Sequence, residues 1–416
     1  MNPDPRTILM VGFSVNILKG LRGWLPVGSV VVLEEPDVCR KRELGTLARE
    51  FAEVATVIET RYQDQQALES LLAAPGLGCI RAVIPGVEYA VPAAAHIAEQ
   101  LGLPGAGVPA ASAFRDKFEL RQAAAAAGLL NPRHALVDRP AQAAAFMEDT
   151  GVPCVLKPTG RQASLGVQIL RSPSDVAVAW ELTHQLDEGV AVPDRGVASR
   201  TMIETLVSGD EYSVEMLVRD GEPCFVNVTG KSVAPGPFPV ETGHVVPADT
   251  GRERWAALSS ATASLTRATR FGTGVLHAEW IVSGDDVTLV ECAARMPGDE
   301  IPALLTKAWG FSFTQAYLRC LMGEEPEFPT QANGAAAIRF LLAEPGEVAE
   351  VTGVEVARSL PGVDDVVVTV RPGSPVGELR SSWDRAGWVL AHGADGPAAR
   401  AAADRGASEV YLRMRQ

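Results

Sequence analysis

Two glutamates on neighbouring strands of a predicted hairpin are the first residues whose spacing suggests chemistry. The sequence GVLHAEWIV-SGDD-VTLVECA predicts two strands joined by a tight turn. If residues 284–286 form a three-residue loop, Ser283 pairs with Val287 and Glu279 faces Glu291. Opposed residues have Cβ atoms roughly 4.5–5.5 Å apart, where two buried carboxylates repel each other unless a divalent cation such as Mg²⁺ lies between them. The alternatives are a register slip by one residue, or a hairpin with one glutamate turned to solvent.

A lysine followed by a glycine-containing loop is the second candidate site. Lys157 ends a predicted strand, and the loop 158–166, which contains Ser164 and Gly166, leads to the next strand. Glycines let a backbone approach an anion closely, and N–H groups exposed there can bind phosphate oxygens beside the lysine charge. A flexible hairpin tip with a solvated lysine is an equally good interpretation of this stretch when it is taken alone.

The composition of the chain limits its class and its partners. The chain has 416 residues, 47% of them hydrophobic, with a net charge of −14 and a pI near 5.0. We therefore expect two to four globular domains, no nucleic-acid partner and no anionic membrane surface. The six cysteines include no C-x-x-C pair, which favours a reducing, cytoplasmic setting. The interrupted apolar run at 7–18 favours a buried first strand over a leader peptide, and no run is long enough to span a membrane.

The elements that must position these side chains fall into three predicted domains. Residues 1–110 alternate strand and helix patterns, which predict an open parallel α/β sheet. A helix is expected to begin at Ser112, which can cap it, and to end at Gly128. From about residue 152 short strands with tight turns predict hairpins, and two helices follow between 301 and 323. After a break near 333 the remaining residues predict a small separate α+β domain.

The candidate residues, taken in chain order, resemble those of a known superfamily. The series comprises Lys117, Lys157, Glu204, Glu211, Glu279, Glu291 and Arg295. In order and spacing it resembles the ATP-grasp superfamily, the ATP-dependent carboxylate–amine ligases, over roughly residues 110–325. The resemblance implies an ATP-grasp fold of mixed α/β and α+β class. Its expected parts are an N-terminal open parallel α/β domain (1–110), the ATP-grasp domain (111–330) with a lid subdomain at about 134–208, and a C-terminal α+β domain (331–416).

The resemblance also implies a set of nucleotide and metal ligands. The expected nucleotide ligands are Lys117, Lys157, Ser164, Gly166, Glu204, Leu206 and Glu211. In the superfamily the two lysines hold the phosphates, the loop 158–166 is a lid over the triphosphate, and the later residues hold the adenine and the ribose. Glu279 and Glu291 match the Mg²⁺ ligands.

Within the superfamily the sequence is most similar to the L-amino acid ligases, the dipeptide-forming enzymes of the bacilysin-ligase type. Many ATP-grasp enzymes carry E-x-N at the second metal position, whereas this chain has Ala293 and so lacks that ligand. The form E-x-A-A-R resembles these ligases, in which Arg295 would bind the phosphate that passes to the substrate. The segment 229–248 resembles their substrate-facing segment. Its acceptor-site residues would be Lys231, Glu241 and His244.

Two histidines and an aspartate near these ligands have alternative interpretations. His244 is expected to help Arg295 stabilise a tetrahedral oxyanion, and a purely structural histidine is the alternative. Asp299 either meets a substrate ammonium group or caps the helix that begins at Ile301. His277 is interpreted as structural.

The function implied by the resemblance is an ATP-dependent ligase that forms a C–N bond. It would join two small substrates, expected to be amino acids, in an amide or peptide bond through an acylphosphate, with release of ADP and phosphate. The expected cofactors are ATP and one or two Mg²⁺ ions, or Mn²⁺ in their place. The partners are a small carboxylate and a small amine, and a homodimer is compatible with the sequence. The alternatives are an ATP-grasp ligase for a non-amino-acid acid or amine, and a non-catalytic nucleotide-binding protein.

Overall fold

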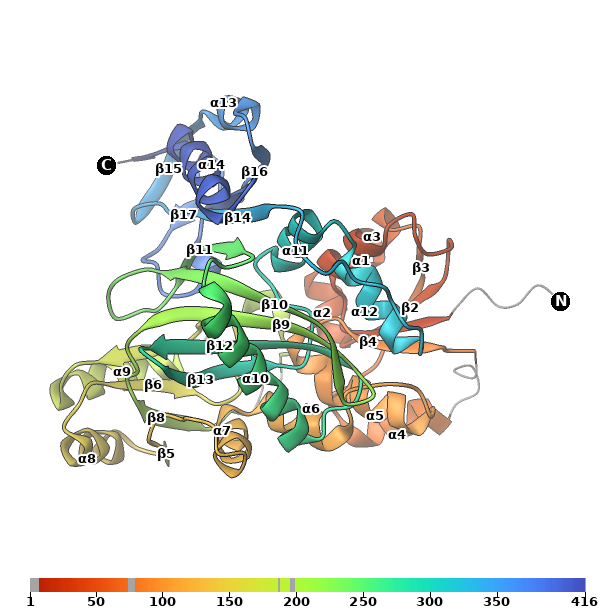
Figure 1. Cartoon of the computed structure of the whole chain (residues 1–416), viewed down its shortest axis with the longest axis horizontal. Coiled ribbons are helices and arrows are strands. Elements are labelled where there is room, and N and C mark those ends of the chain that lie inside the picture. The colour runs from red at the N-terminus through yellow and green to blue at the C-terminus, as the bar shows by residue number, and fades with distance from the viewer. Residues whose placement is uncertain (1–6, 74–78, 186–187, 195–198, 416) are drawn as a thin grey trace.

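The computed structural model describes residues 7–73, 79–185, 188–194 and 199–415 (Figure 1). Small parts of the predicted domains, namely 1–6, 74–78, 186–187, 195–198 and 416, lie outside the described residues. The N-terminal domain is a parallel sheet in the order β3-β2-β1-β4, so the predicted open α/β sheet is confirmed. Its strands are β1 (Ile8–Val11), β2 (Val30–Glu34), β3 (Val54–Glu59) and β4 (Ala82–Pro85). Its helices are α1 (Val15–Leu21), α2 (Pro36–Lys41), α3 (Leu44–Leu47), α4 (Gln65–Ala73) and α5 (Val91–Gln100).

The helix predicted from Ser112 is two helices, and the prediction of one continuous helix is wrong. α6 (Val108–Arg115) ends before Asp116, and α7 (Lys117–Ala126) begins after it. Asp116 has extended backbone angles, and its side chain accepts hydrogen bonds from the first turn of α7. This N-cap stabilises a new helix start within a sequence of high helix propensity. Lys117 therefore lies at the first position of α7, where its own N–H donates to the Thr159 carbonyl.

The predicted lid region forms an antiparallel sheet in the order β5-β8-β6-β7. Its strands are β5 (His134–Val137), β6 (Cys154–Pro158), β7 (Gln168–Leu170) and β8 (Thr201–Thr205). Two helices, α8 (Pro140–Thr150) and α9 (Val176–His184), pack on this sheet around a small core of their own. The hairpin predicted around the glycine-containing loop is β6–β7.

One sheet of eight strands, in the order β13-β12-β9-β10-β11-β14-β18-β16, forms the centre of the molecule. The strands of its first part are β9 (Asp210–Arg219), β10 (Glu222–Val233), β11 (Glu241–Val246), β12 (Gly274–Ser283) and β13 (Asp286–Ala293). The accompanying helices are α10 (Gly251–Thr269), α11 (Ile301–Trp309) and α12 (Phe313–Leu321). The predicted hairpins β9–β10 and β12–β13 are confirmed.

The C-terminal part has the predicted α+β character, but it is not separate from the central domain. Three of its strands, β14 (Ala335–Leu341), β16 (Val363–Val368) and β18 (Gly387–Gly393), extend the central sheet, because β14 pairs with β11. A second sheet has the order β17-β15-β19. Its strands are β15 (Gly346–Thr352), β17 (Pro375–Val376) and β19 (Tyr411–Arg415), and the helices are α13 (Val354–Ser359) and α14 (Gly396–Glu409).

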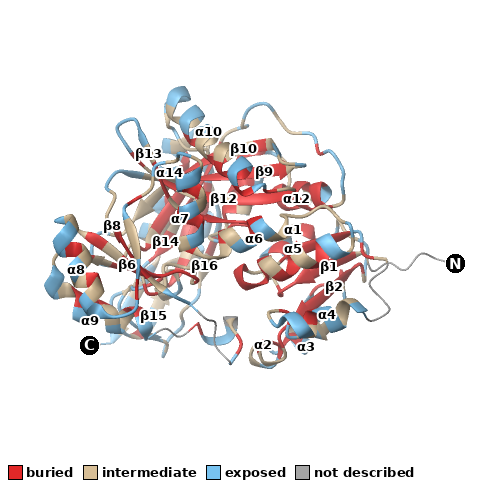
Figure 2. Cartoon of the chain, turned by 90° about the horizontal axis from the view of Figure 1, so that it is seen from below, coloured by how far each residue is buried: buried red, intermediate tan, exposed pale blue. Residues whose placement is uncertain are grey.

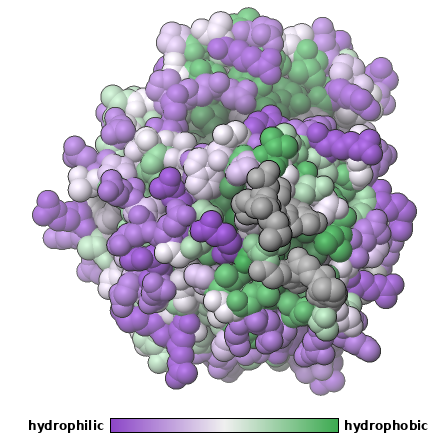
Figure 3. All heavy atoms as spheres, turned by 90° about the vertical axis from the view of Figure 1, so that its right-hand side faces the viewer, coloured by the Kyte–Doolittle hydropathy of each residue, from purple (hydrophilic) through white to green (hydrophobic). Residues whose placement is uncertain are grey.

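The core and the surface follow from this arrangement. The strands of the N-terminal and central sheets are mostly buried, whereas the outer faces of the surface helices are exposed (Figure 2). The face turned to the viewer in Figure 3, on the side of the N-terminal domain, has a largely hydrophilic rim with apolar patches inside it. Among the described residues no helix combines the length and the apolar composition that a membrane crossing requires.

Candidate active site

A cavity of about 480 Å³ is lined by residues of the N-terminal domain, the lid, the central sheet and the C-terminal part. The structure brings almost all the sequence-predicted site residues to it. Those that line it are Lys117, Lys157, Ser164, Glu204, Leu206, Glu211, Lys231, Glu241, His244, Glu279, Glu291, Arg295 and Asp299. Gly166 does not line it; this residue adopts a positive φ of 75° in the lid loop, and its carbonyl accepts a hydrogen bond from Thr183.

The hairpin β12–β13 places Glu279 opposite Glu291, as predicted, but by a different route. The predicted three-residue loop is wrong, because Ser283 pairs with Asp286 across a turn of two residues. A β-bulge at Val290 then adds back the one residue that the shorter turn removes. Both carboxylates therefore line the same cavity, although each is paired with a lysine: Lys117 lies 2.8 Å from Glu291 and Lys231 lies 2.6 Å from Glu279.

The lid is tied to the central domain by a buried ion cluster around Glu204 on β8. Arg121 on α7 donates two hydrogen bonds to this carboxylate, and Lys157 on β6 donates a third. Burial raises the pKa of Glu204, but Arg121 and Lys157 outweigh it and lower the value to about 2. Burial also lowers the pKa of Lys157, against the effect of Glu204. Arg121, which the sequence analysis missed, further donates to the carbonyl of the bulge residue Val290.

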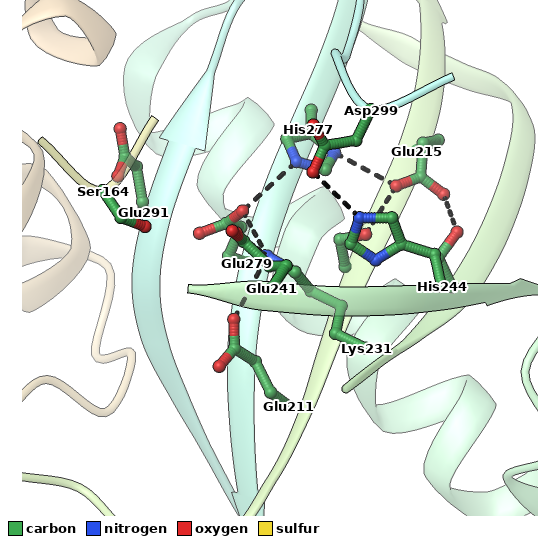
Figure 4. Close-up of polar contacts among 12 residues, drawn as sticks. Ser164, Glu211, Glu215, Lys231, Glu241, His244, His277, Glu279, Glu291 and Asp299 are labelled. Carbon is green, nitrogen blue, oxygen red and sulfur yellow. Dashed lines mark hydrogen bonds and ion pairs between the residues drawn. The ribbon is translucent and has the colours of Figure 1, made fainter. Parts of the chain in front are cut away.

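A single buried lysine holds three carboxylates together at the centre of the cavity (Figure 4). Lys231 Nζ lies 2.6 Å from Glu279, 3.1 Å from Glu211 and 3.2 Å from Glu241. Burial lowers the pKa of Lys231, but the three carboxylates raise it well above its usual range. Burial raises the pKa of Glu211, which Lys231 only partly offsets. The lysine predicted for the acceptor site thus contacts predicted ribose and metal ligands as well as Glu241.

Another part of the cavity lining contains an aspartate, Asp299, that contacts an arginine and a histidine. Arg385 forms two hydrogen bonds with Asp299, and His244 Nε2 lies 3.1 Å from the same carboxylate. Burial raises the pKa of Asp299, but His244 and Arg385 lower it well below its usual range. The predicted helix-capping role is wrong, because Glu300 is the N-cap residue of α11 and no side chain caps that helix. Arg385 comes from the C-terminal part, so no local sequence signal marks it as a site residue.

Arg295 is held by a buried acid of the N-terminal domain. Its Nε donates to Glu88 at 2.5 Å, and its Nη1 donates to the Met296 carbonyl at 2.9 Å. Glu88 begins the short helix η2 (Glu88–Ala90) after β4 and also contacts Arg115. Burial raises the pKa of Glu88, but Arg295 and Arg115 lower it below its usual value. No local sequence pattern marks Glu88 as a site residue, because its contact with Arg295 spans 207 residues of the chain.

A second histidine also lines the cavity. His277 on β12 lies between Glu215 and Glu279, at 3.0 Å and 3.3 Å (Figure 4). Burial lowers the pKa of His277, but the hydrogen bonds to Glu215 and Glu279 raise it to about 9. Its interpretation as a structural residue did not anticipate this contact with Glu279.

The donor set of the cavity fits a hard cation that is bound mainly by substrate oxygens. Glu279 and Glu291 offer carboxylates, which Mg²⁺ prefers, and Mg²⁺ commonly uses only one or two protein carboxylates besides phosphate oxygens. The described residues contain no group of three or more side chains arranged to hold a metal by themselves. Ala293, which lines the cavity on β13, cannot supply the further ligand that an asparagine would.

Comparison with family models identifies two segments of the chain. Residues 150–303 match the model of the ATP-grasp domain, and residues 339–415 match the model of the L-amino acid ligase C-terminal domain 2.

The chain is also similar to curated proteins and to a solved structure. The chain is 25% identical over 281 residues to an alanine–anticapsin ligase of Bacillus subtilis, with 64% of this chain and 59% of that protein covered. The chain thus spans about three fifths of the length of this relative. It is 27% identical over 365 residues to a formate-dependent phosphoribosylglycinamide formyltransferase of Nitratidesulfovibrio vulgaris, with 84% of each covered. The solved L-amino acid ligase of Bacillus licheniformis has a similar fold, with a TM-score of 0.79, 17% identity and 99% of both chains covered.

Proposed function

We propose that this chain, whose residues 150–303 match the ATP-grasp domain model, is an ATP-dependent ligase that joins two amino acids. One substrate carboxylate is phosphorylated by ATP to an acylphosphate, and the amine of the second substrate displaces the phosphate to form the amide bond. The match to the L-amino acid ligase C-terminal domain and the similarity to the alanine–anticapsin ligase support amino acids as substrates. The products are the dipeptide, ADP and phosphate.

The first task of the chain is to bind and orient the triphosphate. Lys117 and Lys157 line the cavity beside the lid loop and carry the charges that would hold phosphate oxygens. Glu279 and Glu291 would hold Mg²⁺, which supplies neutralisation of the charge that develops on the phosphates. To reach a phosphate, the Lys117 ammonium would exchange its contact with Glu291 for one with the nucleotide, which would leave the Glu291 carboxylate available to hold Mg²⁺.

Arg295 is proposed to bind the phosphoryl group as it moves to the substrate carboxylate. Its guanidinium presents a planar fork of donors that matches the oxygens of a phosphate. Glu88 fixes one edge of the fork through Nε, so the side chain is oriented before substrate arrives. In this proposal the same donors would also stabilise the oxyanion that forms when the amine attacks the acyl carbon.

The lid loop is proposed to exclude water from the acylphosphate. Ser164 donates to the Pro239 carbonyl at 3.1 Å, and the backbone of Ser382 donates to the Ala163 carbonyl at 3.1 Å. These contacts join the loop to the segment before β11 and to the C-terminal part, which encloses the cavity on that side. An enclosed site protects a reactive intermediate from hydrolysis.

The observation that carries this proposal is the convergence of both predicted phosphate lysines, both paired glutamates and Arg295 on one cavity. The test is a screen of ADP and phosphate release over pairs of amino acids, with mass detection of the ligated product. Release that depends on a specific pair and yields the matching dipeptide would support the proposal. Tight ATP binding without turnover for any acid and amine would instead indicate a non-catalytic nucleotide-binding protein.

A second candidate is an ATP-grasp ligase for a non-amino-acid acid or amine. The similarity to the formyltransferase over 84% of the chain favours it, because that protein is named for a formate-dependent formyltransferase reaction on phosphoribosylglycinamide. Adding formate, bicarbonate and other simple acids to the same screen distinguishes the two. Release with such an acid, and with no amino acid in the carboxylate role, would favour the second candidate.

A further inference from the structure

A buried chain of polar groups leads from the interior of the central sheet to Glu279 (Figure 4). Glu215 on β9 is fully buried, and it accepts hydrogen bonds from Ser213 at 2.7 Å, Asn227 at 2.8 Å and Thr229 at 2.6 Å. His277 Nδ1 lies 3.0 Å from the same carboxylate. Each donor comes from β9, β10 or β12, which are adjacent strands, so the Glu215 carboxylate is fixed in position.

The other nitrogen of the His277 ring faces Glu279. Its Nε2 lies 3.3 Å from Glu279 Oε1, and Lys231 Nζ lies 2.6 Å from the same oxygen. Both groups therefore engage Oε1, which leaves Oε2 as the oxygen for a ligand in the cavity. Lys231 alone cannot set the orientation of Glu279, because its ammonium is shared with Glu211 and Glu241.

We propose that His277, anchored by Glu215, is a positioning residue that orients Glu279 so that Oε2 binds the metal of the metal–nucleotide complex. The inference rests on the proposed function, in which Glu279 is a metal ligand. Groups that hold a metal ligand in place typically raise metal affinity by roughly 10- to 100-fold over a site that lacks them. A histidine that served only to fill the sheet would affect the stability of the protein and leave its metal affinity unchanged.

Two substitutions separate the two ends of the ring. His277→Asn keeps an amide nitrogen near the position of Nδ1 and so retains the bond to Glu215, but it cannot reach Glu279. His277→Gln places its amide nitrogen near the position of Nε2, so it retains the contact with Glu279 but loses the anchor at Glu215. The matched control is His392→Asn, since His392 lies exposed on β18, pairs with Asp364 and does not line the cavity.

The measurement is the affinity for Mn²⁺ in the presence of a non-hydrolysable ATP analogue, read from the electron paramagnetic resonance signal of free Mn²⁺. We expect His277→Asn to weaken Mn²⁺ binding by about 10- to 100-fold, His277→Gln by a smaller factor, and His392→Asn not at all. Thermal unfolding in metal-free buffer shows whether each variant is folded. If His277→Asn does not fold, unchanged Mn²⁺ affinity in His277→Gln overturns the proposal.

A fourth variant, Glu279→Gln, separates this inference from the proposed function. If Glu279→Gln weakens Mn²⁺ binding while His277→Asn binds Mn²⁺ as tightly as the wild type, the positioning role is wrong and the metal site stands. If Glu279→Gln leaves Mn²⁺ binding unchanged, the assignment of Glu279 as a metal ligand is itself wrong.

Discussion

At the scale of single residues, the cationic side chains proposed to act on phosphate are all paired with carboxylates of the chain. Lys117 contacts Glu291, Lys157 contacts Glu204, and Arg295 contacts Glu88. Buried charges need such partners, because an unpaired charge costs several kcal/mol in a low-dielectric interior. A bound triphosphate must therefore replace part of this pairing, and metal binding at Glu291 would release Lys117 for that purpose.

The site residues found from the sequence and those that were missed differ in the range of their contacts. Glu279 and Glu291 were found because a hairpin places them together by local pairing, which turn residues and strand alternation reveal. Glu88 and Arg385 were missed because packing between distant parts of the chain brings them to Arg295 and Asp299. No pattern in one sequence encodes such contacts.

Arg295→Lys is expected to lower the rate of ligation by about 100- to 1,000-fold, while ATP binds as in the wild type. The substitution keeps a charge beside Glu88 but loses the planar fork that would hold the transferred phosphoryl group. Ligation rates and nucleotide binding, measured on the same preparations, check this. The control is Arg133→Lys, an exposed arginine of the lid that pairs with Asp149. Normal ligation by Arg295→Lys would contradict the role assigned to Arg295.

At the scale of elements, the structure differs from the sequence prediction in one hairpin and in one helix. The hairpin β12–β13 has a shorter turn than predicted and a β-bulge at Val290, and the two differences cancel. A bulge leaves little trace in the sequence, because it depends on how the unpaired backbone is satisfied; here Arg121 donates to the Val290 carbonyl. The sequence predicts one helix because Ser112 is also a favourable N-cap residue, whereas in the structure Asp116 caps a second helix, α7.

The attachment of the lid strand β8 to helix α7 gives a pH-dependent prediction. The pKa of Glu204 in the folded protein is about 2, below the value of 4.5 for the free side chain. The ionised carboxylate therefore stabilises the fold fully above pH 4.5, and this contribution is lost as the pH falls from 4.5 towards 2. Glu204→Gln leaves Arg121 and Lys157 without their partner, so we expect it to lower the free energy of unfolding near neutral pH by roughly 3–5 kcal/mol.

The difference in free energy of unfolding between wild type and Glu204→Gln should shrink as the pH is lowered below 4.5, because the wild-type carboxyl then becomes neutral as well. Urea unfolding at neutral pH and at several pH values below 4.5 measures this difference. Glu181→Gln, at an exposed position of α9 in the same lid, is the control and should differ from the wild type by less than about 0.5 kcal/mol. A difference that stays constant with pH would show that Glu204 is not the titrating group.

At the scale of the whole molecule, sequence patterns predicted the local structure of each part but not the continuity between the central and C-terminal parts. Changes in composition and in the pattern of predicted strands and helices near residues 110 and 333 suggested boundaries between parts. The open parallel sheet, the hairpins and the C-terminal α+β character were predicted from strand and turn patterns. The pairing of β11 with β14 joins segments separated by some 90 residues and is set by packing. The cavity depends on this continuity, since Ser382, Trp383 and Arg385 reach it from the C-terminal part.

Removal of residues 331–416 is therefore expected to disrupt the central domain, although the sequence predicted a separate C-terminal domain. The truncation would expose the edge of β11, whose residues Gly243 to Val246 pair with β14, and unpaired strand edges promote aggregation. It would also uncover the apolar side chains that pack against Ile338 and Leu390, which belong to the main core.

Size-exclusion chromatography and limited proteolysis of residues 1–330, beside the full chain, measure the effect of this truncation. We expect the truncated protein to aggregate or to be cleaved rapidly within the central domain, whereas the full chain resists. A stable, monomeric 1–330 fragment would mean that the shared sheet does not couple the two parts.

The point variant Arg385→Gln tests the C-terminal part without disrupting the sheet, since it removes only the guanidinium that contacts Asp299. It should remain folded and bind ATP normally while the KM for an amino-acid substrate rises, because Asp299 and His244 line the cavity. An unchanged KM in Arg385→Gln would mean that the C-terminal part does not contribute to substrate binding.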